Sequence, residues 1–81
     1  MVKLQVIGPG CKNCERLAER TEEAALQLDL DHQLEKITEL NKFADYGVMM
    51  TPGLAVDGEA VVTGTVPGVD QIKKILEKEV G

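Results

Sequence analysis

A Gly-Pro-Gly break at residues 8–10 separates two contrasting patterns near the start of the chain. Before the break, Val2–Ile7 places alternate apolar side chains on one face, which predicts a short strand buried mainly on that side. After it, apolar residues recur at steps of three and four over residues 11–28, which is typical of an amphipathic helix. The chain therefore passes from a strand through a tight turn directly into a helix, and both cysteines, Cys11 and Cys14, lie at that helix start.

Residues 32–47 repeat the order of strand and helix. His32–Ile37 is a polar run, which favours a strand at the edge of the sheet because charged side chains discourage pairing with other chains. A short helix is predicted next, with Thr38 as its N-cap and with Leu40 and Phe43 on its apolar face. Gly47 marks the predicted end of this helix.

The last third of the chain predicts a hairpin and a final helix. Asp57-Gly58 is a strong turn signal between apolar runs at residues 54–56 and 60–63. Apolar residues at helical spacing over residues 69–80 predict the helix. Just before the hairpin, Met49 and Met50 flank the active-site loop and could form an adaptable apolar docking surface, but we favour the interpretation that they fill gaps in the core, because methionine adapts to irregular spaces.

The predicted element order is β-α-β-α-β-β-α. Two successive strand-to-helix steps favour parallel pairing of the first two strands through a right-handed crossover, and the hairpin adds antiparallel strands. A chain of 81 residues has room for one modest core. We therefore expect a single α/β domain over residues 1–81, built on a four-stranded mixed sheet.

The charge balance narrows the range of partners. Nine Lys and Arg residues against fourteen Asp and Glu residues give a net charge of −5, and no basic cluster offers itself to phosphates, which argues against nucleic acid and anionic membranes. The N-terminus lacks a secretory signal, and no apolar run is long enough to cross a bilayer, so we expect a cytoplasmic protein. In that reducing compartment, a cysteine pair is more often catalytic than structural.

The position of the two cysteines predicts that they are unequal. Cys11 lies at the mouth of the helix, where free N–H groups and the helix dipole favour a thiolate, and Lys12 adds a neighbouring cation that would tune it. Cys14 falls on the same face, close to the inward apolar stripe, and would be buried and less ionised. We therefore interpret Cys11 as the nucleophile and Cys14 as the resolving thiol.

Two alternatives use the same Cys-x-x-Cys spacing. Small metal-handling domains hold a soft ion between two thiolates, and a redox-sensing interaction domain would change its surface when the bridge forms. A structural zinc site needs four ligands, whereas this chain offers two cysteines and His32 on a different strand. Spacing alone leaves these alternatives open.

The stretch "MTPGLAV" is the second informative motif. A proline that precedes a strand has no donor for the ladder, so Pro52 is either an ordinary strand-start residue or part of a cis Thr51-Pro52 bond. Together, the Cys-x-x-Cys at a helix start, the Thr-Pro before a later strand, the hairpin and the terminal helix resemble the thioredoxin and glutaredoxin superfamily. The chain is most similar to small archaeal and bacterial redox-active disulfide proteins, which have a thioredoxin-like fold of glutaredoxin size. The segments that carry this resemblance are "GPGCKNC", "EKITEL", "YGVMMTPGLAVDG" and "VVTGTVPGVDQIKKIL".

The resemblance implies a thioredoxin-like fold with helices on both faces of the sheet, and a protein-disulfide oxidoreductase. In such a protein Cys11 attacks, Cys14 resolves, Pro52 is cis beside them, and Thr51 offers backbone groups to the substrate chain. It implies no metal or organic cofactor. The implied partners are protein disulfides and an electron-donating flavoprotein similar to thioredoxin reductase, with the chain itself a monomer.

The active-site motif departs from both well-known relatives. Gly10-Cys11-Lys12-Asn13-Cys14 replaces the Trp-Cys-Gly-Pro-Cys of thioredoxin and the Cys-Pro-Tyr-Cys of glutaredoxin. Since the central residues tune the sulfur environment, the reduction potential of neither relative carries over. No basic and aromatic glutathione pocket is evident in the sequence.

Overall fold

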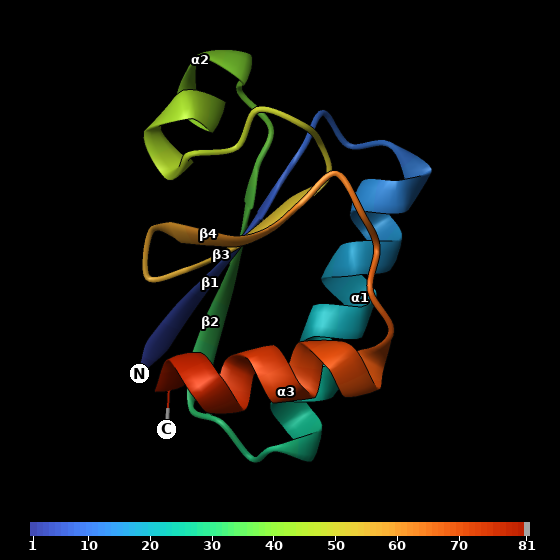
Figure 1. Cartoon of the computed structure of the whole chain (residues 1–81), viewed down its shortest axis with the longest axis vertical. Coiled ribbons are helices and arrows are strands. Elements are labelled where there is room, and N and C mark those ends of the chain that lie inside the picture. Colours follow the sequence, from blue (N-terminus) through green and yellow to red (C-terminus); the bar gives the residue numbers. More distant parts are fainter. Residues whose placement is uncertain (81) are drawn as a thin grey trace.

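The computed structural model describes residues 1–80 and contains the predicted alternation of strands and helices (Figure 1). Its elements are β1 (Val2–Ile7), α1 (Lys12–Gln27), β2 (His32–Ile37), α2 (Leu40–Phe43), the 3-10 turn η1 (Ala44–Tyr46), β3 (Gly53–Val56), β4 (Glu59–Thr63) and α3 (Val69–Val80). Among these described residues, no helix combines the length and the apolar character that a membrane span requires.

The four strands form one mixed sheet in the order β2-β1-β3-β4. β1 runs parallel to β2, with Val2 opposite His32 and Ile7 opposite Ile37, and antiparallel to β3. β4 pairs with β3 in an antiparallel manner, with an irregularity in the register between Leu54 and Ala55. The polar strand β2 therefore lies at an edge, as predicted, and the first strand of the chain lies in the middle of the sheet.

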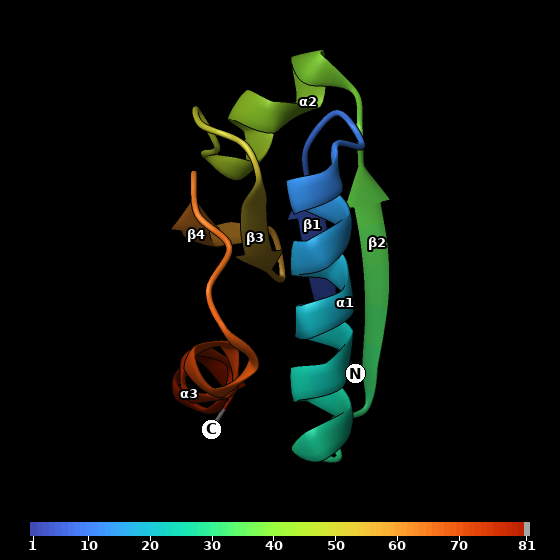
Figure 2. The same cartoon turned by 90° about the vertical axis from the view of Figure 1, so that its right-hand side faces the viewer.

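Helices cover both faces of the sheet, as the predicted fold requires (Figure 2). α1 and α3 pack on the face that carries the alternate apolar residues of β1, and this larger core includes Leu4, Leu17, Leu54, Ile72 and Leu76, all fully buried. α2 and η1 cover the opposite face, where the smaller core is built from Ile7, Phe43, Val48 and Ala55. The sequence period of two in β1 thus divides its side chains between two hydrophobic layers.

The Asp57-Gly58 turn is tied back to the central strand. Both residues have positive φ, 51° and 91°, which suits the tight hairpin turn that their sequence predicted. The Asp57 N–H donates to the Lys3 carbonyl at 2.7 Å, and the Lys3 N–H donates to the Asp57 carboxylate at 2.9 Å. The buried Gln5 amide oxygen accepts a hydrogen bond from the Gly58 N–H at 3.2 Å, which satisfies a polar group inside the sheet.

The predicted start and apolar face of the second helix are wrong in detail. Glu39 is the N-cap residue and makes no side-chain capping bond, so Thr38 does not cap the helix. The ladder between β1 and β2 continues through a bond from the Gly8 N–H to the Ile37 carbonyl, which leaves the chain extended past that point. Because α2 is a single turn, Phe43 reaches the core while Leu40 remains 75% exposed.

The prediction that Met49 and Met50 fill the core is also wrong. Their exposed fractions are 95% and 65%. The space beneath this segment is taken by the buried Val48, whose side chain lies directly over Gly53, so that no gap remains for a longer side chain. The segment instead presents both thioethers to solvent, next to Thr51.

His32 joins α1 to β2, on the half-buried side of the edge strand. Its Nδ1 lies 2.9 Å from the Leu30 carbonyl, and its Nε2 lies 3.0 Å from the Glu22 carboxylate. Only the protonated ring donates to both oxygens at once. The Leu30 carbonyl and then the Glu22 carboxylate raise the pKa of His32, while burial of the ring opposes them.

This contact predicts a pH-dependent contribution to stability. A pKa raised above 6.5 in the folded chain means that the contribution is fully present below about pH 6.5 and is lost as the pH rises through the folded value. We expect the free energy of unfolding of His32→Gln to lie furthest below that of the unmodified chain on the acidic side of this window, and Glu22→Gln to show part of the effect. Urea titrations across the window measure it, and a constant difference at all pH values would contradict it.

Candidate active site

The sequence folds so that Cys11 caps helix α1. Cys11 is the N-cap residue with extended backbone angles, φ −72° and ψ 171°. The preceding Gly10 has a φ of +92°, a conformation that favours glycine, and turns the chain into the helix. The Cys11 sulfur accepts the Cys14 N–H at 3.4 Å, and the Cys11 carbonyl accepts the Glu15 N–H at 3.0 Å. The thiol thus lies against N–H groups that have no partner within the helix.

The two thiols are close together but differ in exposure. Their Sγ atoms lie 2.8 Å apart, and both cysteines are free. Cys11 is exposed, whereas Cys14 is only 6% exposed. The structure therefore places one sulfur where a second molecule can reach it and keeps the other behind it, within reach of the first.

The surroundings of Cys11 favour its thiolate. A hydrogen bond from the Cys14 thiol, followed by the Cys14 backbone N–H, lowers the pKa of Cys11 below the ordinary value of 9.0, and partial desolvation opposes these effects. Lys12 is the first residue of α1 and is exposed. The groups that lower the pKa of Cys11 belong to Cys14 and to the backbone of the helix start, so the tuning role of Lys12 stays a prediction.

The surroundings of Cys14 favour its thiol. Burial raises the pKa of Cys14, and the hydrogen bond to Cys11 raises it further because that bond uses the Cys14 proton. At a given pH the exposed sulfur is therefore the more ionised of the two. This difference agrees with the roles that the helix position suggested, nucleophile for Cys11 and resolving thiol for Cys14.

Gly8 is a site residue that the sequence reasoning missed. A β-carbon at Gly8 would overlap the Cys14 sulfur and would lie 3.8 Å from the Pro52 α-carbon. A small pocket of about 80 Å³ adjoins Cys14 here and is also lined by Lys36 and Thr38. The available signal was a glycine that ends an apolar strand directly before a Cys-x-x-Cys, where close approach of another group requires the absence of a side chain.

The Thr51-Pro52 peptide bond is cis, which is the conformation that the family resemblance implied. Pro52 is buried and lies across Gly8 from Cys14, while Thr51 is exposed. The Pro52 carbonyl accepts the Gly64 N–H at 2.8 Å, which connects this turn to the end of β4. The fold thus brings Pro52 beside the cysteines; that Thr51 binds a substrate backbone stays a prediction.

This site offers two thiols, those of Cys11 and Cys14, as ligands to a metal ion. In the part of the chain that the structure describes, no group of three or more His, Cys, Asp or Glu side chains is arranged to hold a metal ion. His32 does not join Cys11 and Cys14, because it lies at the start of β2 in contact with Glu22. The donor set is therefore the cysteine pair alone.

The fold and this dithiol assign the chain to the class of thioredoxin-like α/β proteins with a Cys-x-x-Cys at the start of a helix. A family model described as "Thioredoxin domain" matches residues 2–77. A thioredoxin from Methanothermobacter thermautotrophicus is 43% identical over 76 residues, which cover 94% of this chain and 99% of that protein. A thioredoxin from Methanocaldococcus jannaschii is 35% identical over 77 residues, which cover 95% and 88%. The chain belongs to the thioredoxin family and is, in general terms, a thiol-disulfide oxidoreductase.

We expect Gly8→Ala to displace Cys14. The added methyl group has to move either the Cys14 sulfur or the start of α1, and overpacking of this kind costs roughly 1–3 kcal/mol. Thermal unfolding should show the loss of stability, and the rate of disulfide reduction should fall. Gly68→Ala is a matched control, because a β-carbon at Gly68 meets no atom within 4 Å. Equal behaviour of the two variants would contradict the packing role of Gly8.

We also expect the two thiols to alkylate at different rates and pH values. With iodoacetamide, Cys11 of the reduced chain should react first, with a midpoint below 9.0, and Cys14 should lag because burial raises its pKa. Peptide mass spectrometry of samples quenched along a pH series measures both sites. Prior modification of Cys14, or a Cys11 midpoint at or above 9.0, would contradict the assignment.

Proposed function

We propose that this chain reduces disulfides of protein substrates by cycling between the Cys11-Cys14 dithiol and the corresponding disulfide. The observation that carries the proposal is the unequal sulfur pair, one exposed and one buried, 2.8 Å apart at a helix N-terminus. The chain's thioredoxin relatives support the same chemistry in general terms. A glutaredoxin-like use of glutathione stays a prediction.

The first step uses the exposed thiolate. Cys11 attacks one sulfur of a substrate disulfide, so the substrate S–S bond breaks and a bond forms between Cys11 and that sulfur. The other substrate sulfur leaves as a thiolate and takes up a proton from solvent. The lowered pKa of Cys11 increases the fraction of thiolate available for this attack.

The second step uses the buried thiol. Cys14 loses its proton and attacks the Cys11 sulfur, which breaks the mixed disulfide and releases the second substrate thiol. The chain ends with a Cys11-Cys14 disulfide, oxidised by two electrons, and the substrate carries two thiols. In the dithiol, the hydrogen bond from the Cys14 thiol to the Cys11 sulfur raises the pKa of Cys14. After the attack Cys11 is no longer a thiolate, so this contribution is lost and the pKa of Cys14 falls. Resolution therefore follows attack.

Two partners complete the cycle. The exposed Thr51, next to the cis-proline, would pair through its backbone with an extended segment of the substrate, a local form of strand addition. An electron-donating flavoprotein similar to thioredoxin reductase would return two electrons and two protons to the disulfide. We place this cycle in the cytoplasm, where dithiols are kept reduced.

Trapping of the mixed disulfide tests the order of attack. We expect Cys14→Ser to remain linked to insulin through a mixed disulfide, because its Cys11 attacks an insulin disulfide and no second thiol of the chain resolves the product. Cys11→Ser should trap nothing, and the unmodified chain should reduce insulin disulfides catalytically with dithiothreitol as the electron source. Non-reducing gel electrophoresis with mass spectrometry identifies the linked cysteine.

Two results would contradict this account. Efficient trapping by Cys11→Ser would reverse the roles of the two cysteines within the same cycle. No insulin reduction by the intact dithiol chain, together with tight stoichiometric binding of a thiophilic ion such as Zn²⁺, would point instead to the soft-metal alternative.

A further inference from the structure

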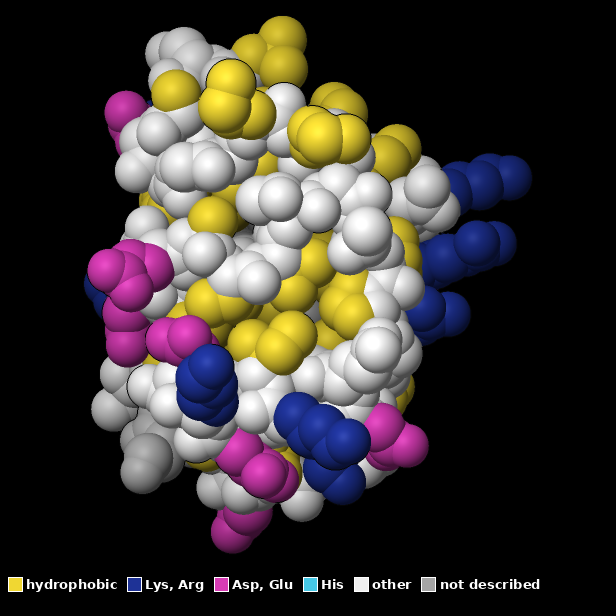
Figure 3. Space-filling view, in the orientation of Figure 1, with side chains coloured by type: hydrophobic (Ala, Val, Ile, Leu, Met, Phe, Trp, Pro, Cys, Tyr) yellow, Lys and Arg dark blue, Asp and Glu magenta, His cyan; other side chains and the backbone are white. Residues whose placement is uncertain are grey.

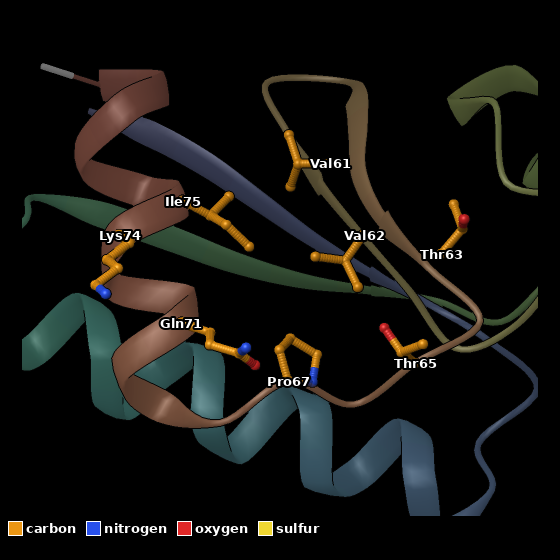
Figure 4. A pocket seen from close by; sticks show the side chains of 8 residues that line it. All are labelled: Val61, Val62, Thr63, Thr65, Pro67, Gln71, Lys74 and Ile75. Carbon is orange, nitrogen blue, oxygen red and sulfur yellow. The ribbon is translucent and has the colours of Figure 1, made fainter.

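A groove of about 560 Å³ lies between β4, α3 and the segment that joins them (Figure 4). Its apolar lining comes from Val61, Val62, Pro67 and Ile75, and the side chains of Val62 and Ile75 point toward one another across it. Val61, Pro67 and Ile75 are only half-buried, so the groove presents apolar surface to solvent. Hydrophobic side chains accordingly gather in the middle of this face of the molecule (Figure 3).

The groove is continuous with the active-site region. Thr63 and Thr65 line one end of it, on either side of Gly64. The Gly64 N–H donates to the carbonyl of the cis-proline Pro52 at 2.8 Å. The exposed Met50 packs on the same glycine, since a β-carbon there would lie 3.2 Å from the Met50 β-carbon. The end of the groove at Thr63 and Thr65 is therefore next to the turn that carries Pro52.

Lys74 is the one charged side chain among the residues that line the groove, and it is exposed. The ion pairs in the described part of the chain are His32 with Glu22 and Lys42 with Glu39, and neither involves Lys74. The chain carries a net charge of −5, which disfavours carboxylates over the surface as a whole. Salt weakens charges beyond about 8 Å, so the cation in the lining acts on the groove more strongly than distant carboxylates do.

We propose that this groove binds an extended segment of the protein substrate next to its reactive cysteine. An aliphatic side chain of that segment lies on Val61 and Ile75, and an acidic side chain faces Lys74. The inference rests on the proposed disulfide reduction and adds to it a preference for substrates with an apolar and an acidic residue near the cysteine.

The dimensions of an extended chain set the spacing. A strand advances about 3.3 Å per residue, so the groove from Thr63 to Val61 accommodates about two residues. The near end of the groove adjoins the turn beside the cysteines, through the bond between Gly64 and Pro52. The aliphatic residue of the substrate therefore lies beyond the residues beside Pro52, and the peptides used below place it about three positions from the cysteine.

Peptide disulfides with defined flanks test the charge preference. Each peptide has a central cysteine, leucine about three positions away on both sides, and either glutamate or lysine beyond the leucines; each is oxidised to its disulfide-linked dimer. Pre-reduced chain is mixed with each dimer, and released peptide thiol is followed in a single turnover. We expect Lys74→Glu to lower the ratio of the glutamate-peptide rate to the lysine-peptide rate by about two- to fivefold, the range for an exposed ion pair.

Lys42→Glu is the matched control, because Lys42 is exposed on α2, does not line the groove and changes the net charge equally. Its rate ratio should remain that of the unmodified chain. A further peptide with serine in place of leucine tests the apolar part. We expect Val61→Thr to lower the ratio of the leucine-peptide rate to the serine-peptide rate roughly twofold. Leu40 is exposed and lies away from the groove, so Leu40→Ser should leave this ratio unchanged.

Three results would overturn the inference. Equal rate ratios for Lys74→Glu and Lys42→Glu would remove the role of Lys74, and a leucine preference unchanged in Val61→Thr would remove the apolar contact. A change in self-association of Lys74→Glu in sedimentation, with unchanged peptide selectivity, would assign the groove to a second copy of the chain. Failure of the unmodified chain to release thiol from any peptide would instead reject the proposed function itself.

Discussion

The contact between Gly8 and Cys14 is the constraint on which the site depends. With no side chain at Gly8, the end of β1 lies directly against the buried sulfur and close to Pro52. This close approach brings the end of the first strand and the first turn of α1, a few residues later, together with the distant turn before β3. The burial of Cys14 behind the exposed Cys11 is part of this arrangement.

The unequal chemistry of the two thiols follows from ordinary features of a helix N-terminus. Free N–H groups lie against the outer sulfur, and the inner sulfur loses its contact with water because α1 packs on the sheet through Leu17 and Ala18. Hydrogen bonding therefore stabilises the outer thiolate, whereas desolvation penalises the inner one. No other ionised side chain is needed for this difference.

Local patterns predicted most of this fold, and the failures occurred where a choice depended on tertiary packing. The period of two in β1, the helical spacing of α1 and the Asp57-Gly58 turn each carry their own signal, and each element forms as expected. The prediction that Thr38 caps the second helix was wrong because the strand ladder keeps the chain extended there. The prediction that Met49 and Met50 are buried was wrong because Val48 already fills the space over Gly53. The glycine before the Cys-x-x-Cys was a signal for Gly8, but its contact with the Cys14 sulfur could not be predicted, because only the fold brings the two together.

The central place of β1 in the sheet has a consequence for how the site is assembled. Leu4 of this strand pairs with Val56, more than half the chain away, so its second neighbour becomes available only after about two-thirds of the sequence has been made. Such distant pairing requires closure of a long loop before any contact offsets the entropy lost. During synthesis the two cysteines therefore emerge well before the turn that is to lie beside them. The attacking and resolving roles that we propose for them belong to the finished sheet, and a nascent chain carries only two thiols on a short segment.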